Sequence, residues 1–180
     1  MKAYIFCILL ILGGLIPSSL AATPLQLYVD NVEVSESNAA NVLKGQGEGR
    51  DGCVSFDYKT YTLTLRGAKL TNSIKITGER PDQLITVQLE GKNEIITKNW
   101  AFQIFSPVLI QGSGSLYIHS SGRYARGFSI SGMQDELYLK ISKTTVRVEA
   151  VNDSNDGEAL FSPVKREGYV IIEDAHFSSI

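Results

Sequence analysis

The sequence predicts an all-β fold, a parallel β-helix of about five coils that forms a single domain. Three observations support this: apolar and polar residues alternate in short runs, each run contains a break, and the unit recurs. Between Tyr61 and Leu70, Leu63 and Leu65 alternate with threonines, Gly67 interrupts the run, and the apolar pattern then resumes. Strict alternation is typical of a strand with one buried face. The glycine therefore marks a corner between two short strands.

Four further units repeat this pattern, at residues 84–96, 107–122, 136–150 and 168–179. One apolar residue just before each corner marks the unit, and consecutive markers are 21 to 31 residues apart: Leu65, Leu89, Ile110, Ile141 and Ile172. A repeat of this length predicts a solenoid, in which each unit stacks on the previous one. We expect the five markers to form one buried ladder.

An additional short strand occupies the same place in each cycle, at residues 73–76, 101–108, 127–130 and 159–164. Three strands per coil with corners between them are typical of a parallel β-helix. An antiparallel β-sandwich is the structural alternative, because short strands and glycine turns also suit it. The β-helix is favoured because a sandwich does not require successive units to share a corner at the same phase.

The segment VSFDYKTYTLTLRGAKL, followed by LEGKNEI and VLIQGSGSLYI, resembles secreted bacterial proteins of a carbohydrate-binding-domain family. The resemblance covers roughly residues 25–150, and its motifs are mostly residues of the structural ladders. It implies a right-handed parallel β-helix, and some members of the family bind acidic plant polysaccharide. No binding residue of the family transfers to a position of this chain.

Residues 1–21 have the features of a secretory signal peptide: Lys2, an apolar stretch over 3–16, and small residues Ser19 and Ala21 before the expected cleavage point. We expect the mature β-helix domain to span residues 22–180, to be secreted to the exterior or the periplasm, and to keep no transmembrane segment. An uncleaved membrane anchor is the alternative. Cys53 is then the only cysteine, which excludes an internal disulfide and predicts a buried thiol.

The outward positions of the strand before each corner suggest a first candidate surface. By alternation, Tyr138 and Tyr169 point outward on successive coils, in one stripe with Pro107, Leu109 and Ile171. Exposed aromatic faces bind the C–H surfaces of sugar rings, and tyrosine adds a hydroxyl for hydrogen bonding. The alternative is that the N-terminal segment or a partner chain covers this stripe.

A second candidate group lies after the corner. Tyr117 and His119 point outward beside Arg147 and Glu149 of the next coil. Such a group is suited to holding a carboxylated sugar, with Arg147 supplying a planar fork of donors. A solvated strand face with ordinary cross-strand pairs is the alternative.

Two loops form a third candidate. The long loop of residues 120–127 contains Arg123, Tyr124 and Arg126. The only tryptophan, Trp100, lies at a turn. Loops often carry recognition residues, and cations beside aromatic rings suit an acidic glycan. Trp100 is alternatively a hydrophobic cap on a corner of the solenoid.

An acidic segment suggests a calcium site. Asp153, Asn155, Asp156 and Glu158 offer several oxygen ligands within six residues. Their spacing is not that of a 12-residue calcium loop, and a polar turn explains the segment without an ion. A calcium ion is therefore the one cofactor that the sequence suggests.

The sequence thus predicts a secreted, non-catalytic carbohydrate-binding module, with acidic polysaccharide as the suggested ligand. The net charge is −2 and no basic cluster occurs, so nucleic acid is not an expected partner. A surface adhesin or structural protein without a glycan ligand is the first alternative. A polysaccharide lyase or hydrolase is the second, but His119 and His176 are isolated and no outward pair of acids lies on adjacent strands.

Overall fold

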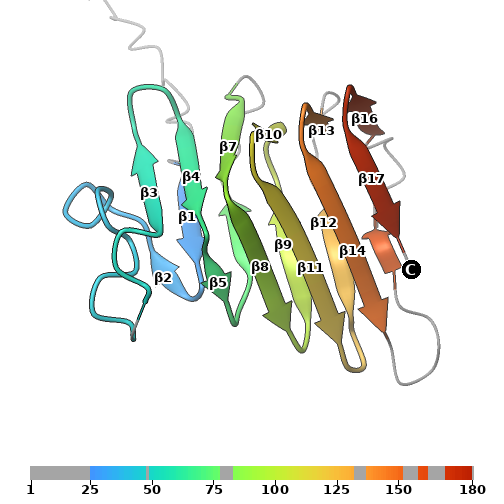
Figure 1. Cartoon of the computed structure of the whole chain (residues 1–180), viewed down its shortest axis with the longest axis horizontal. Helices are drawn as coiled ribbons and strands as arrows, with labels where there is room; N and C mark the ends of the chain where they lie inside the picture. The colour runs from blue at the N-terminus through green and yellow to red at the C-terminus, as the bar shows by residue number, and fades with distance from the viewer. Residues whose placement is uncertain are drawn as a thin grey trace, which may run out of the picture.

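The computed structural model describes residues 25–47, 49–77, 83–131, 137–151, 158–161 and 169–179. Within these ranges the regular secondary structure consists of β-strands alone. The strands follow one another along an axis that runs across Figure 1. No helix among the described residues is long and apolar enough to cross a membrane. The expected signal peptide, residues 1–21, lies outside these ranges.

The strands form three sheets. In spatial order, sheet A contains β15 (Glu158–Phe161), β12 (Arg126–Ile130), β9 (Trp100–Ile104), β6 (Ile74–Thr77), β1 (Gln26–Val29) and β2 (Val32–Glu33). Sheet B contains β16 (Tyr169–Glu173), β13 (Tyr138–Ser142), β10 (Val108–Gly112), β7 (Ile85–Glu90), β4 (Thr62–Arg66) and β3 (Val54–Asp57). Sheet C contains β17 (His176–Ser179), β14 (Thr145–Val151), β11 (Ser115–Ser121), β8 (Lys92–Thr97) and β5 (Lys69–Leu70).

From β4 onward each sheet takes every third strand of the chain, which is the topology of a solenoid with three strands per coil. The stacked strands pair in parallel, as β8, β11 and β14 do at the front of Figure 1. The expected all-β class and parallel stacking are therefore confirmed. The solenoid has about three turns, so the expected number of five coils is wrong. β5 has only two residues, and no described strand of sheet A follows β16 and β17.

The buried ladder of sheet B differs from the expected one. Leu65 and Leu89 pair as expected, but Leu89 then lies opposite Gly112. The continuous ladder consists of Leu63, Val87, Ile110, Ile141 and Ile172. Ile172 is 49% exposed because it lies on the last strand of sheet B. The register expected from the corner markers is thus wrong by two residues between β7 and β10.

Two glycines explain this shift. At Gly112, φ is +128°, and an added Cβ would lie 2.3 Å from the carbonyl oxygen of Leu89. At Gly114 an added Cβ would lie 2.4 Å from the carbonyl oxygen of Gly91. The corner of this coil therefore passes directly over the backbone of the preceding coil, at a distance that only glycine allows.

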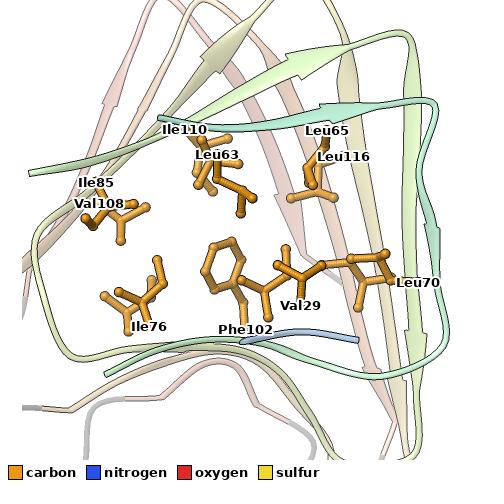
Figure 2. Close-up of a cluster of buried hydrophobic side chains, with 14 of the residues drawn as sticks. Val29, Leu63, Leu65, Leu70, Ile76, Ile85, Phe102, Val108, Ile110 and Leu116 are labelled. Carbon is orange, nitrogen blue, oxygen red and sulfur yellow. The ribbon is translucent and has the colours of Figure 1, made fainter. Parts of the chain in front are cut away.

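Apolar side chains from all three sheets fill the interior. Figure 2 shows Ile110 and Leu63 of sheet B facing Phe102 of sheet A, with Leu70 and Leu116 on the side of sheet C. The residues of this cluster are buried almost completely. Because every second side chain of these strands enters a common dry core, as the alternating burial along β7 shows, the solenoid gains its stability from burial of apolar area.

One corner is closed by a buried amide. The Asn93 side chain accepts a hydrogen bond from the Ala68 amide at 2.9 Å and donates to the carbonyl oxygens of Glu90, Gly91 and Ser115. It therefore joins three successive coils at this corner through hydrogen bonds to their backbones.

The N-terminal end of the solenoid is built from antiparallel strands. β1 pairs antiparallel with both β2 and β6, and β3 pairs antiparallel with β4. Cys53 precedes β3 and is buried, as expected, and burial raises the pKa of its thiol.

Candidate functional site

A pocket of about 390 Å³ lies at the edge where the corners lead from sheet C into sheet A. Its lining combines two aromatic rings with four amide side chains and two hydroxyl side chains from different coils. The lining residues are Asn31, Asn72, Ser73, Thr97, Asn99, Trp100, Gln103 and Tyr124. This size falls within the range of small-molecule sites, at its lower end.

Trp100 is the first residue of β9 and follows directly after the corner at residues 98–99. In the register of sheet A it pairs with Arg126 of β12, whose guanidinium carbon lies 5.2 Å from the centre of the indole ring. Asn72 and Ser73 precede β6, the strand on the other side of β9. The indole therefore has Arg126 on the β12 side, and Asn72 and Ser73 lie on the β6 side.

Tyr124 reaches the pocket from the loop between β11 and β12. Gly122 begins this loop with a φ of +94°, and an added Cβ there would lie 2.8 Å from the carbonyl oxygen of Lys98. The loop closes through a hydrogen bond from the Ala125 amide to the Gly122 carbonyl at 3.0 Å. Tyr124 is 56% exposed, and the Arg123 guanidinium carbon lies 5.5 Å from its ring centre. Two of the loop candidates, Trp100 and Tyr124, thus line one pocket.

The side of the pocket near Asn72 is fixed by a buried carboxylate. Asp30 accepts hydrogen bonds from the backbone amides of Thr71 and Asn72, and its own amide donates to the carbonyl of Ser73. Arg50 pairs with the other oxygen of this carboxylate. A charge buried in this way is tolerated because it is both paired and hydrogen-bonded. The turn between β1 and β2 is thereby joined rigidly to the corner before β6.

A buried hydroxyl fixes the middle of the pocket. Ser120 is fully buried; its side chain donates to the carbonyl of Asn99 and accepts from the Arg126 amide at 2.9 Å. The corner that carries Asn99 and the strand that carries Arg126 therefore keep a constant spacing across two coils. The pocket is preorganised, because the backbone on either side of Trp100 is tied down by side chains.

The second candidate group is brought together on the outer face of sheet C. Tyr117 donates a hydrogen bond to Glu149 at 2.6 Å, His119 Nδ1 lies 3.4 Å from the same oxygen, and Arg147 pairs with the other oxygen. The hydrogen bond from Tyr117 lowers the pKa of Glu149, and the same bond raises the pKa of Tyr117.

The charge of Arg147 is therefore already compensated by Glu149 within this group. Tyr117, Arg147 and Glu149 line a pocket of about 370 Å³, together with Ser115, Leu116 and Thr145. An incoming sugar carboxylate would have to compete with Glu149 for the guanidinium. This arrangement weakens the expectation that Arg147 offers its donors to a ligand.

The expected stripe on sheet B is interrupted at Lys140. Tyr138 pairs directly with Tyr169 in the register of β13 and β16, but Lys140 lies between Leu109 and Ile171. The Lys140 ammonium is 2.7 Å from a carboxylate oxygen of Glu173. The two apolar side chains are thus separated by an ion pair.

The proposed calcium segment falls mostly outside the described residues. Asp153, Asn155 and Asp156 lie there, while Glu158 starts β15 and its carboxylate is 3.4 Å from Arg126 Nε. Among the described residues no cluster of three or more histidine, cysteine or acidic side chains has the arrangement of a metal site.

The amides of the pocket were not anticipated from the sequence. Asn72 and Asn99 occupy the same corner of successive coils, just before a strand of sheet A, and Gln103 lies on β9 itself. Asn31 lies at a turn, with a φ of +68°. The recurrence of asparagine at one corner phase is the signal that would have identified this edge.

No protein-family model, curated protein or solved structure matches the chain.

Proposed function

We propose that this protein is a secreted, non-catalytic carbohydrate-binding module that binds acidic polysaccharide through the pocket at Trp100 and Tyr124. One observation carries the proposal: the pocket combines these two aromatic rings with the amide side chains of Asn31, Asn72 and Asn99, together with Gln103. The resemblance to a family of secreted carbohydrate-binding domains supports it independently of the pocket.

The lining has the chemistry that a sugar requires. Aromatic side chains offer an apolar face to the C–H groups of a pyranose ring, and each amide supplies both a donor and an acceptor for hydroxyl groups. The described lining residues are all uncharged, so the polar contacts are neutral and directional. A few polar groups that fix the orientation of a ligand against an apolar surface are typical of a specific small-ligand site.

The preference for an acidic glycan rests on the cations beside the pocket. Arg123 lies against Tyr124, and Arg126 lies against Trp100 and pairs with Glu158. Arginine binds carboxylates through two parallel hydrogen bonds. We propose that Arg123 favours uronic acid residues next to the aromatic contacts, whereas at Arg126 a sugar carboxylate competes with Glu158, as it does with Glu149 at Arg147.

Binding is favoured over cleavage because none of the described residues that line the pocket carries a carboxylate that would serve as a general acid or base. An adhesin or structural protein would also display a loop such as residues 122–125 without binding sugar. The two proposals differ in one measurable property, the affinity for glycans.

Titration calorimetry of the secreted protein against polygalacturonate and a neutral glucan tests the proposal. Tyr124→Ala is expected to weaken binding of both glycans, because stacking does not depend on ligand charge. Replacing Arg123 and Arg126 together by alanine is expected to weaken the acidic glycan more, and salt is expected to weaken it further. Gln111→Ala, on the outer face of β10 in sheet B, is the matched control.

Three outcomes would contradict the proposal. Absence of binding to any glycan favours the adhesin or structural alternative, and new reducing ends after long incubation favour an enzyme. Loss of affinity on Tyr138→Ala with none on Tyr124→Ala would move the site to the face of sheet B that carries Tyr138 and Tyr169. The same titration with and without a chelator tests whether calcium takes part.

A further inference from the structure

We propose that the pocket at Trp100 receives the end of a glycan chain and not an internal segment. This inference rests on the proposed function and adds which part of the polysaccharide chain binds in the pocket. It follows from the direction in which the lining residues are stacked, from the turn that terminates the stack, and from the size of the pocket.

The lining residues come from corners that are stacked along the solenoid axis. Asn72 lies on the corner before β6, Asn99 on the corner before β9, and Tyr124 on the loop before β12. These three strands are consecutive neighbours in sheet A. Adjacent strands are ~4.8 Å apart, so a ligand that touches all three corners lies parallel to the axis.

The turn between β1 and β2 terminates this stack of corners. Because β1 pairs with β6 with Val29 opposite Ile74, the turn lies beside the corner that carries Asn72. Asn31 from this turn lines the pocket. The hairpin is antiparallel and returns through β2 at the edge of sheet A, so no corner of the same kind follows it among the described residues.

The turn is also a firm wall. Asp30 holds the amides of Thr71 and Asn72, and it is held in turn by Arg50. Because Asn31 lies in this rigid turn and lines the pocket, a bound sugar chain would not extend past it. The opposite end of the pocket, near Tyr124 and Arg123, leads toward the later coils.

The volume agrees with a chain end. The pocket of about 390 Å³ is near the lower limit of small-molecule sites. The stack from Asn31 to Tyr124 covers three strand spacings, roughly 14 Å. Such a site holds a short terminal portion of a chain, whereas binding of an internal segment requires a groove that is open at both ends.

The test uses calorimetry to compare three galacturonate ligands of different length: a trimer, a hexamer and a long polymer whose molar concentration of chains is known. If the protein binds chain ends, affinity per chain is equal for the three ligands and the polymer binds one protein molecule per chain. If it binds internal segments, the number of protein molecules per chain rises with polymer length, which would overturn the inference and leave the proposed function standing. Absence of binding to all three ligands would overturn both.

A variant of the turn supplies the second readout. Asn31→Gly introduces a residue that tolerates the positive φ of this position, and it removes only the side-chain amide. We expect a loss of roughly fivefold to tenfold in affinity, the equivalent of one hydrogen bond, and the same factor for trimer and polymer. Gln111→Ala is the control. An unchanged affinity of Asn31→Gly for the trimer would contradict the role of the turn as the wall of the site.

Discussion

Replacement of Gly112 by alanine tests the close stacking of coils that sets the register. At this position φ is +128°, and the new Cβ would lie 2.3 Å from the Leu89 carbonyl oxygen and 2.8 Å from its amide nitrogen. Both neighbours are backbone atoms of the preceding coil, so neither moves without disturbing the ladder. Strain of this kind costs about 1–3 kcal/mol, and overpacking against fixed atoms costs about 1–3 kcal/mol more. The two costs together give an expected loss of about 2–6 kcal/mol.

Urea unfolding measures this loss, and two matched variants separate its causes. Gly67 has a φ of +57° and nothing within 4 Å of an added Cβ, so Gly67→Ala carries only the backbone cost of about 1–2 kcal/mol. Gly114→Ala carries only the steric cost, because its Cβ would lie 2.4 Å from the Gly91 carbonyl oxygen without a positive φ. Equal losses for Gly112→Ala and Gly67→Ala would refute the stacking of this corner over Leu89.

Three further predictions follow from other parts of the chain. Asn93→Ala should lower the free energy of unfolding by about 1–3 kcal/mol, since it removes the partner of the buried Ala68 amide; an unchanged urea midpoint would contradict this. Because the pKa of Glu149 is lowered in the fold, its ionised form stabilises the protein above pH 4.5, the ordinary value. The difference in urea midpoint between the natural protein and Glu149→Gln should therefore shrink as the pH falls below 4.5, and a constant difference would exclude this contribution. Mass spectrometry of the exported protein should find Ala22 at its N-terminus, or Thr23 with cleavage one residue later; an intact Met1 would exclude the signal peptide.

The β-solenoid could be predicted because its two main determinants are local in sequence. Alternation in runs such as that around Leu63 identifies a strand with one buried face, and glycines such as Gly67 identify corners. The register between β7 and β10 could not be predicted in the same way. It depends on Gly112 passing over the backbone of Leu89, and alternation within one strand does not report how a corner stacks on another coil.

The candidate site could be predicted in part. Trp100, Tyr124 and Arg123 could be identified because they are aromatic or basic residues in predicted loops. The sequence did not indicate that Trp100 and Tyr124 line one pocket. Their proximity depends on which corners are superimposed. The buried Asp30 shows the same limit: its partners include backbone amides 41 and 42 residues later in the chain. Contacts of this kind follow from the stacking of coils and leave no local pattern.

The central claim is that the pocket at Trp100 binds a glycan, and the fluorescence of this residue tests it most directly. Trp100 is the only tryptophan of the chain, so its emission reports on the pocket alone. Titration of the natural protein with galacturonate oligomers should give a saturable change in emission, and Tyr124→Ala should shift the titration to higher concentration. Unchanged emission at concentrations where calorimetry detects binding would place the glycan elsewhere on the solenoid, and unchanged emission without any binding would contradict the proposed function itself.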